Sequence, residues 1–197
     1  MTRIVAGFAG SLTLQVPKSG TRPTSDRVRE AIFSALDARD AVHGARVLDL
    51  YAGSGALALE AVSRGAASAV LVEKNAAAAQ VCRRNAAAVA ASARAASRHA
   101  PHPLPAIDVR AAAVTSYLAG ASGPFDVVFI DPPYDVGDGD LHEVLTVLVP
   151  LLAEDAVVCV ERSARGPEPT LPAGLALERR KDYGETAIFW LSPAPAA

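Results

Sequence analysis

A run of apolar residues, 125–130, leads into four residues whose types suit the binding of a planar amine: Asp131, Pro132, Pro133 and Tyr134. Each proline fixes φ at about −65° and lacks an N–H, so the turn is stiff and its carbonyls are held in one direction. The Asp131 carboxylate and the Pro132 carbonyl can each accept one hydrogen of an exocyclic amine, which turns the nitrogen lone pair toward a methyl donor. Tyr134 can stack on the base that carries the amine. The turn therefore predicts methylation of an amine.

A glycine turn follows an earlier apolar run, 46–51. Gly53, Gly55 and Ala58 match the dinucleotide-binding fingerprint, and Glu73 lies 18 residues beyond Gly55. The fingerprint alone fits nicotinamide, flavin and S-adenosylmethionine (AdoMet) folds. Asp49, four residues before Gly53, would repel a pyrophosphate by roughly 1–4 kcal/mol but would attract the amino group of methionine. The turn therefore favours AdoMet over NAD, with Glu73 as acceptor for the ribose hydroxyls.

Basic residues are concentrated at the N-terminus, although the chain has a net charge of −2. Residues 1–29 contain one acidic residue, Asp26, and five basic residues: Arg3, Lys18, Arg22, Arg27 and Arg29. A basic segment on an acidic body is typical of nucleic-acid contact, so these five side chains are candidates for binding phosphates.

Apolar runs alternate with helical stretches through most of the chain. The predicted strands are 46–51, 69–73, 107–109, 125–130 and 157–161, and the predicted helices are 56–64, 76–91, 112–118 and 141–152. Two further strands are predicted between 175 and 191. This alternation predicts an α/β fold, a seven-stranded and mostly parallel sheet with helices on both faces. Before it, residues 3–8 and 11–16 predict a β-hairpin, and a helix is predicted to end near 38.

Composition excludes several other classes of protein. Two cysteines exclude a disulfide framework and a four-cysteine zinc site, and the four histidines lack partner ligands, so no metal is expected. The longest strongly apolar run, 144–153, is too short to cross a membrane. A cytoplasmic monomer is expected, with an extension at 1–40 and a catalytic domain at 41–192. Residues 92–105, rich in Ala, Ser, His and Pro, are expected to form a surface loop.

Three motifs together resemble those of class I AdoMet-dependent amine methyltransferases with a Rossmann-like fold: 49–55, 73–75 and 131–134. The segment 21–33, with the sequence TRPTSDRVREAIF, narrows the resemblance to the RsmD family. Members of this family methylate the exocyclic N2 of one guanine in bacterial 16S ribosomal RNA. The resemblance covers residues 3 to about 191.

The resemblance implies roles for residues in three groups. The catalytic group is Asp131, Pro132, Pro133 and Tyr134. The AdoMet-binding group is Asp49, Tyr51, Ala52, Gly53, Gly55, Glu73, Lys74 and Ala112, the last placed near adenine by the fold. The extension is expected to bind RNA without affecting AdoMet, so that deletion of 1–20 spares cofactor binding. An assembled 30S particle is the expected substrate, because the basic segment alone supplies little recognition.

Two other functions remain open at the level of sequence. The same turn could serve an amine methyltransferase acting on adenine N6 of DNA or on a protein glutamine. The chain could also be a non-catalytic RNA-binding assembly factor that keeps AdoMet as a structural ligand.

Overall fold

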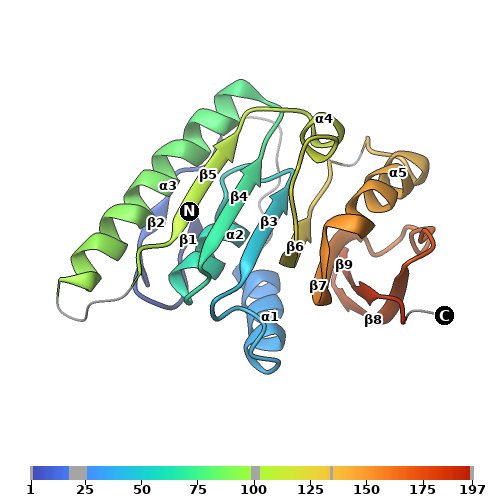
Figure 1. Cartoon of the computed structure of the whole chain (residues 1–197), viewed down its shortest axis with the longest axis horizontal. Helices are drawn as coiled ribbons and strands as arrows, with labels where there is room; N and C mark the ends of the chain where they lie inside the picture. The colour runs from blue at the N-terminus through green and yellow to red at the C-terminus, as the bar shows by residue number, and fades with distance from the viewer. Residues whose placement is uncertain (1, 18–25, 99–102, 134, 196–197) are drawn as a thin grey trace.

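One seven-stranded sheet runs through the centre of the computed structural model, which describes residues 2–17, 26–98, 103–133 and 135–195 (Figure 1). In spatial order the strands are β5 (Ala106–Arg110), β4 (Ser68–Val72), β3 (Arg46–Leu50), β6 (Phe125–Ile130), β7 (Leu152–Ser163), β9 (Thr186–Pro193) and β8 (Leu175–Tyr183). The strands from β5 to β7 are parallel, whereas β9 is antiparallel to both of its neighbours. The predicted mostly parallel sheet is confirmed.

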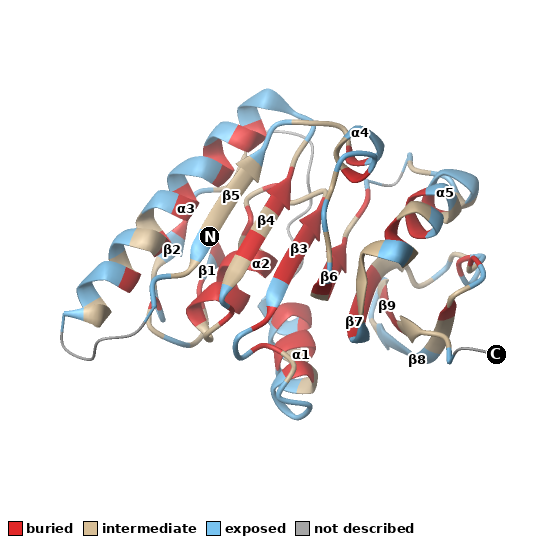
Figure 2. Cartoon of the chain, in the orientation of Figure 1, coloured by how far each residue is buried: buried red, intermediate tan, exposed pale blue. Residues whose placement is uncertain are grey.

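Helices cover both faces of the sheet because the central strands are apolar on both sides. Alternate residues of β3 point to opposite cores, with Val47 in one and Leu48 in the other. The first core receives α1 (Asp26–Asp37), α2 (Ala56–Ser63) and α3 (Ala76–Ser97). The second receives α4 (Val114–Leu118) and α5 (Asp138–Leu148), which continues into a 3-10 turn, Val149–Leu151. The central strands are accordingly buried almost throughout (Figure 2).

The N-terminal hairpin is much shorter than the sequence predicts. Its two strands, β1 (Thr2–Arg3) and β2 (Thr13–Leu14), have two residues each, instead of the predicted strands over 3–8 and 11–16. Ile4 still pairs with the returning backbone, since its N–H donates to Leu12 O (2.9 Å), but the N–H groups that follow it donate to α2 instead. Phe8 N donates to Ser63 O (2.9 Å) and Ala9 N donates to Ser63 Oγ (2.9 Å). The segment is therefore docked on a helix rather than paired as a ribbon.

A buried carboxylate anchors this segment to the sheet domain. Glu60 of α2 is fully buried, and it accepts hydrogen bonds from Val5 N (2.6 Å), Ala6 N (3.0 Å) and Arg64 Nε (2.8 Å). Ile4, Ala9 and Leu14 also belong to the core that α1 and α2 share with the sheet. Deletion of residues 1–20 would open that core and remove two of these three hydrogen bonds, leaving Arg64 as the partner of the carboxylate. The prediction that deletion of 1–20 leaves cofactor binding nearly unchanged stays a prediction, and the packing shows that the deleted segment is also part of the fold.

Helix α3 extends six residues further than predicted. It ends at Ser97, so the predicted loop at 92–105 is wrong over its first part. Alanine has the highest helix propensity, and the Ser92 hydroxyl donates back to Ala88 O (3.2 Å) within the helix. Ala93 is buried against the core. The alanine- and serine-rich sequence from residue 92 to residue 97, which suggested a loop, therefore continues α3, with one side of the helix packed against the core.

The predicted boundaries also shift in the C-terminal half. The helix predicted at 141–152 begins three residues earlier, at Asp138, and ends at Leu148. Strand β7 begins five residues before the predicted 157, and its pairing with β6 is irregular between Phe125 and Val127. This irregularity marks the early part of β7, which carries the exposed Glu154 and Asp155 and so lacks the apolar signature of a buried strand.

Replacing Glu60 should test the anchor. We expect Glu60→Ala to lower the free energy of unfolding by about 3–5 kcal/mol, because the guanidinium of Arg64 and two backbone N–H groups lose their buried acceptor. Urea denaturation followed by circular dichroism measures the change. The matched control is Glu143→Ala at an exposed position of α5, which should stay within about 0.5 kcal/mol of the unmodified chain. Equal effects of the two substitutions would contradict the anchor.

Candidate active site

The candidate residues meet at the carboxyl edge of the sheet, where the strand order reverses. The chain passes from β3 to β4 and β5 on one side, whereas β6 lies on the other side of β3. Leu50 pairs with the last residue of both β4 and β6, so the residues that follow, Tyr51, Glu73 and Asp131, leave the sheet at the same level. Such a switch point is where open α/β sheets bind ligands.

The turn after β3 depends on glycine for both conformation and space. Gly53 has φ +56° and Gly55 has φ +80°, values in the left-handed region that favours glycine. A Cβ at Gly55 would lie 2.7 Å from Leu71 Cδ2 and 2.9 Å from Cys82 Sγ. Tyr51 also has a positive φ, +66°, without the freedom of glycine. A non-glycine residue in this region is strained by about 1–3 kcal/mol, a feature that is common at functional sites.

Glu73 holds the turn from the neighbouring strand. Its Oε2 accepts from Gly53 N (2.9 Å), and its Oε1 accepts from Asn75 N (2.7 Å). Asn75 in turn caps α3 by accepting from the backbone of Ala77 and Ala78 (both 3.0 Å). Each carboxylate oxygen can accept more than one hydrogen bond, so these contacts leave capacity for hydroxyl donors. The carboxylate is therefore fixed in position beside the glycine turn.

Asp49 lies beneath the turn and is only 2% exposed. Its Oδ2 accepts from Ala58 N (3.2 Å) in the first turn of α2. Burial raises the pKa of this carboxyl to about 7; the Ala58 bond opposes the rise and the charge of Glu73 adds to it. Within the residues that the structure describes, no basic side chain forms an ion pair with Asp49 or Glu73. Two acids without a cation suit a ligand that carries positive charge.

The remaining cofactor-binding candidates lie along the same edge. Ala52 N donates to Val72 O (3.0 Å), which ties the turn to the end of β4. Ala112 is half-buried between β5 and α4, and Lys74 is exposed directly after Glu73. All eight cofactor-binding candidates are thus brought together by the ends of β3, β4 and β5.

The proline turn leaves β6 beside them. Asp131 is half-buried and its N–H makes a long hydrogen bond to Leu50 O (3.5 Å). Pro132 is buried, while Pro133 is exposed and its carbonyl accepts from Val136 N (3.0 Å). Tyr134 lies outside the described residues.

Arg162 was missed by the sequence analysis. It follows the buried part of β7, and its Nη2 donates to Val136 O (3.0 Å), so it braces the loop that continues from the prolines. Its position one residue after the predicted strand 157–161 was the available signal. Charged residues just beyond an apolar run of a parallel sheet reach the ligand edge.

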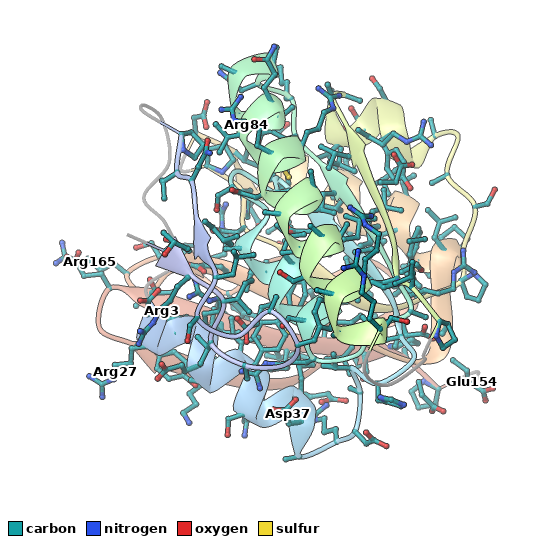
Figure 3. The ribbon with its side chains drawn as sticks, turned by 90° about the vertical axis from the view of Figure 1, so that its left-hand side faces the viewer. Arg3, Arg27, Asp37, Arg84, Glu154 and Arg165 are labelled. Carbon is teal, nitrogen blue, oxygen red and sulfur yellow. The ribbon has the colours of Figure 1, made fainter. Side chains whose placement is uncertain are left out.

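The basic N-terminal candidates divide into exposed and buried residues. Arg3 and Arg27 are exposed and project from the same side of the molecule in Figure 3, as does Arg165. Lys18 and Arg22 lie outside the described residues. The exposed pair is accessible to a polyanion.

Arg29 contradicts its predicted role as a phosphate ligand. Its side chain is 1% exposed, and its Nη2 donates to Arg3 O (2.6 Å) and to Asp26 Oδ1 (2.9 Å). The residue lies on the inner face of α1 between Val28 and Ile32, which both pack into the core. Helical spacing places Arg29 there, and a count of charges does not reveal it. Arg29 therefore joins α1 to β1 instead of presenting its charge to solvent.

Two cavities in the structure lie away from these residues. One of about 440 Å³ lies between α3 and β5, and one of about 700 Å³ lies at the amino-terminal edge of the sheet near Asp126 and Asp155. The described residues contain no group of three or more His, Cys, Asp or Glu side chains that could hold a metal ion. None of the helices described is long and apolar enough to span a bilayer.

The sheet order and the site define a class I methyltransferase fold. The ribosomal protein L11 methylase of Lactobacillus delbrueckii subsp. bulgaricus has a similar structure, with a TM-score of 0.59 over 86% of this chain and 80% of that one. At 17% identity this likeness concerns the fold alone. The Escherichia coli structure of yhhF is more similar, with a TM-score of 0.77 and 34% identity over 98% of this chain and 97% of that one.

Sequence comparison narrows the class to a family. The family model described as Conserved hypothetical protein 95 matches residues 2–192. Ribosomal RNA small subunit methyltransferase D of Escherichia coli K12 is 38% identical over 189 residues, which cover 94% of this chain and 86% of that protein. The chain belongs to this family, and the membership of the RsmD family predicted from residues 21–33 is confirmed.

The pKa of Asp49 predicts how stability depends on pH. Because the folded-state pKa is raised from 3.8 to about 7, the stability that the protonated carboxyl contributes is complete below pH 4 and is lost as pH rises through 7. Asp49→Asn cannot ionise. We therefore expect it to match the unmodified chain near pH 4 and to exceed it at pH 8 by at most about 4 kcal/mol. Urea unfolding of both proteins without ligand at the two pH values tests this; a difference that does not change with pH would contradict it.

Proposed function

We propose that this chain transfers a methyl group from AdoMet to the exocyclic N2 of a guanine in 16S ribosomal RNA within an assembled small-subunit particle in the cytoplasm. The observation that carries the proposal is the meeting of Asp131, Glu73 and Tyr51 at one level of the sheet edge, with Asp49 beneath. The ribosomal RNA named in the E. coli relative supports the class of substrate. The RsmD motifs support the guanine amine.

The cofactor site is proposed from its charge and its donor set. The uncompensated Asp49 carboxylate suits the methionine ammonium, and Glu73 suits the ribose hydroxyls. Gly53 and Gly55 allow the turn to take its left-handed backbone conformation beside the proposed ligand, and the backbone near Ala112 is proposed to contact adenine. When bound, AdoMet supplies an electrophilic methyl group on a sulfonium, whose positive charge the same two acids favour.

Asp131 and Pro132 are proposed to orient the amine. The guanine N2 lone pair is delocalised into the ring, so its direction must be fixed by acceptors for its two hydrogens. One carboxylate oxygen and one carbonyl oxygen can do this from a stiff turn. Asp131 need not remove a proton before attack, because the nitrogen becomes acidic only as the new C–N bond forms. Pro133 stiffens the turn, and Tyr134 is proposed to stack on the base.

Arg3 and Arg27 are proposed to hold phosphates of the RNA, and Lys18 and Arg22 remain candidates from the sequence alone. Phosphate contacts fix position without reading sequence. Two to four such contacts are few for a specific RNA site, so the folded particle must supply the rest of the recognition.

Asp131→Ala should separate chemistry from binding. We expect transfer of labelled methyl groups to 30S particles with unmodified 16S RNA to fall by about a hundredfold or more in a single turnover, as for the loss of one preorganised polar contact. Affinities for S-adenosylhomocysteine and for the particle should stay within about twofold. Asp155→Ala, exposed at the opposite edge of the sheet, is the matched control and should retain full activity. If the unmodified chain placed label in DNA or protein instead of RNA, or transferred no label at all, the proposed function would be overturned.

Arg27→Ala should change how salt affects RNA binding. Loss of one phosphate contact reduces the slope of log affinity against log salt by about one. Filter binding to the particle between low and physiological salt measures the slope, with Arg94→Ala on α3 as the exposed control. An unchanged slope in the Arg27 variant, or an equal change in both, would remove Arg27 from the RNA surface.

A further inference from the structure

Asn85 connects two segments that the sequence analysis treated as independent. It lies on α3 and is 3% exposed. Its Oδ1 accepts from Gln15 N (2.9 Å), and its Nδ2 donates to Gln15 O (2.9 Å) and to Ser54 O (2.8 Å). Gln15 directly follows β2 of the N-terminal segment, and Ser54 stands between Gly53 and Gly55. One buried amide thus joins the basic N-terminal segment to the glycine turn.

The partners define the orientation of this amide. Gln15 offers both an N–H and a carbonyl, whereas Ser54 offers a carbonyl, so the Nδ2 side must face the glycine turn. Both amide hydrogens and the amide oxygen are then used. If Gln15 were displaced, a buried donor and a buried acceptor would lose their partners, which is unfavourable because neither would be hydrated. The side chain is therefore stable in this position only when both segments are present.

The glycine turn needs support of this kind. Glycine has more backbone freedom to lose than any other residue, so a turn with two left-handed glycines is poorly fixed by its own sequence. Glu73 holds it at Gly53 N, and Ala52 O accepts from Gly55 N (2.6 Å). The bond from Asn85 to Ser54 O holds the middle of the turn. The three contacts together fix all three residues from 53 to 55.

We propose that Asn85 is a positioning residue that couples docking of the N-terminal segment to cofactor binding. With Gln15 docked, Asn85 holds Ser54 in the geometry that accepts the cofactor; with the cofactor bound, the same bonds stabilise the docked segment. Such coupling is reciprocal by thermodynamic necessity and ranges from about 5-fold to 150-fold in affinity. Contact of RNA with the basic segment would then strengthen cofactor binding. The coupling rests on the proposed function for the identity of the cofactor.

The experiment compares three variants with the unmodified chain. Asn85→Ala removes the bonds to both segments. As a carboxylate, Asn85→Asp retains the acceptor for Gln15 N but cannot donate to Gln15 O or to Ser54 O. The matched control is Arg84→Ala. Arg84 lies exposed beside Asn85 on the same helix, and its Nε donates to Gln15 Oε1 (2.9 Å), but among the described residues it forms no hydrogen bond with the turn. The readouts are affinity for S-adenosylhomocysteine by calorimetry and the exchange rate of the Gln15 amide hydrogen by NMR.

We expect the ligand to slow exchange at Gln15 by at least about fivefold in the unmodified chain and in Arg84→Ala. Both Asn85 variants should bind the ligand at least about fivefold more weakly, and the ligand should no longer slow exchange at Gln15. A merely structural role would change overall stability without removing the ligand response. The effect of the ligand on exchange at Gln15 can be measured in the unmodified chain, so the coupling can be rejected even where a variant fails to fold.

The outcomes separate this coupling from the proposed cofactor. Binding without any response at Gln15, or normal affinity in Asn85→Ala, would overturn the coupling and leave the cofactor assignment standing. Failure of the unmodified chain to bind S-adenosylhomocysteine would overturn the cofactor assignment, and the coupling with it.

Discussion

The parallel register that joins Leu50 to the ends of β4 and β6 is the constraint on which the rest of the site depends. Side chains alternate along a strand, so a slip of one residue would send Asp49 to the opposite core, among the residues that α4 and α5 cover. The same slip would separate Glu73 from Gly53 N, to which it now accepts at 2.9 Å. Because both faces of β3 are covered by apolar residues, such a slip would place the Asp49 carboxyl among apolar side chains and is therefore unfavourable. The register that builds the core therefore also aligns the acids.

That alignment opposes stability at neutral pH. Burial raises the pKa of the Asp49 carboxyl to about 7, so the free energy of unfolding falls as pH rises toward 7 and this group ionises. A chain selected for stability alone would place an apolar or neutral residue there. The opposing trend is typical of sites that await a charged ligand, whose binding then returns part of that free energy. The destabilisation that this buried acid causes at neutral pH is thus consistent with a site for a cationic ligand.

The sequence predicted the sheet and the cluster of acids because both depend on local patterns. Apolar runs end at defined residues, and Glu73 and Asp131 follow them directly. Contacts between distant segments leave no such pattern. Nothing in a count of charges shows that Arg29 faces inward on α1, and a lone Asn85 in an alanine-rich helix has no signal of its own. The short hairpin was mispredicted for the same reason, since Glu60 lies 55 residues from the backbone that it binds.

The N-terminal segment therefore belongs to the fold as well as to the proposed RNA surface. Glu60 holds it at Val5 and Ala6, and Asn85 holds it again at Gln15. Between these anchors the segment packs against α2, and beyond them the chain returns through α1 to the first strand of the sheet. A surface attached at two buried polar points cannot shift as an independent arm. A polyanion bound to it, as proposed, would therefore act on a segment joined to α2 and α3, and these are the two helices whose first turns contact Asp49 and follow Glu73.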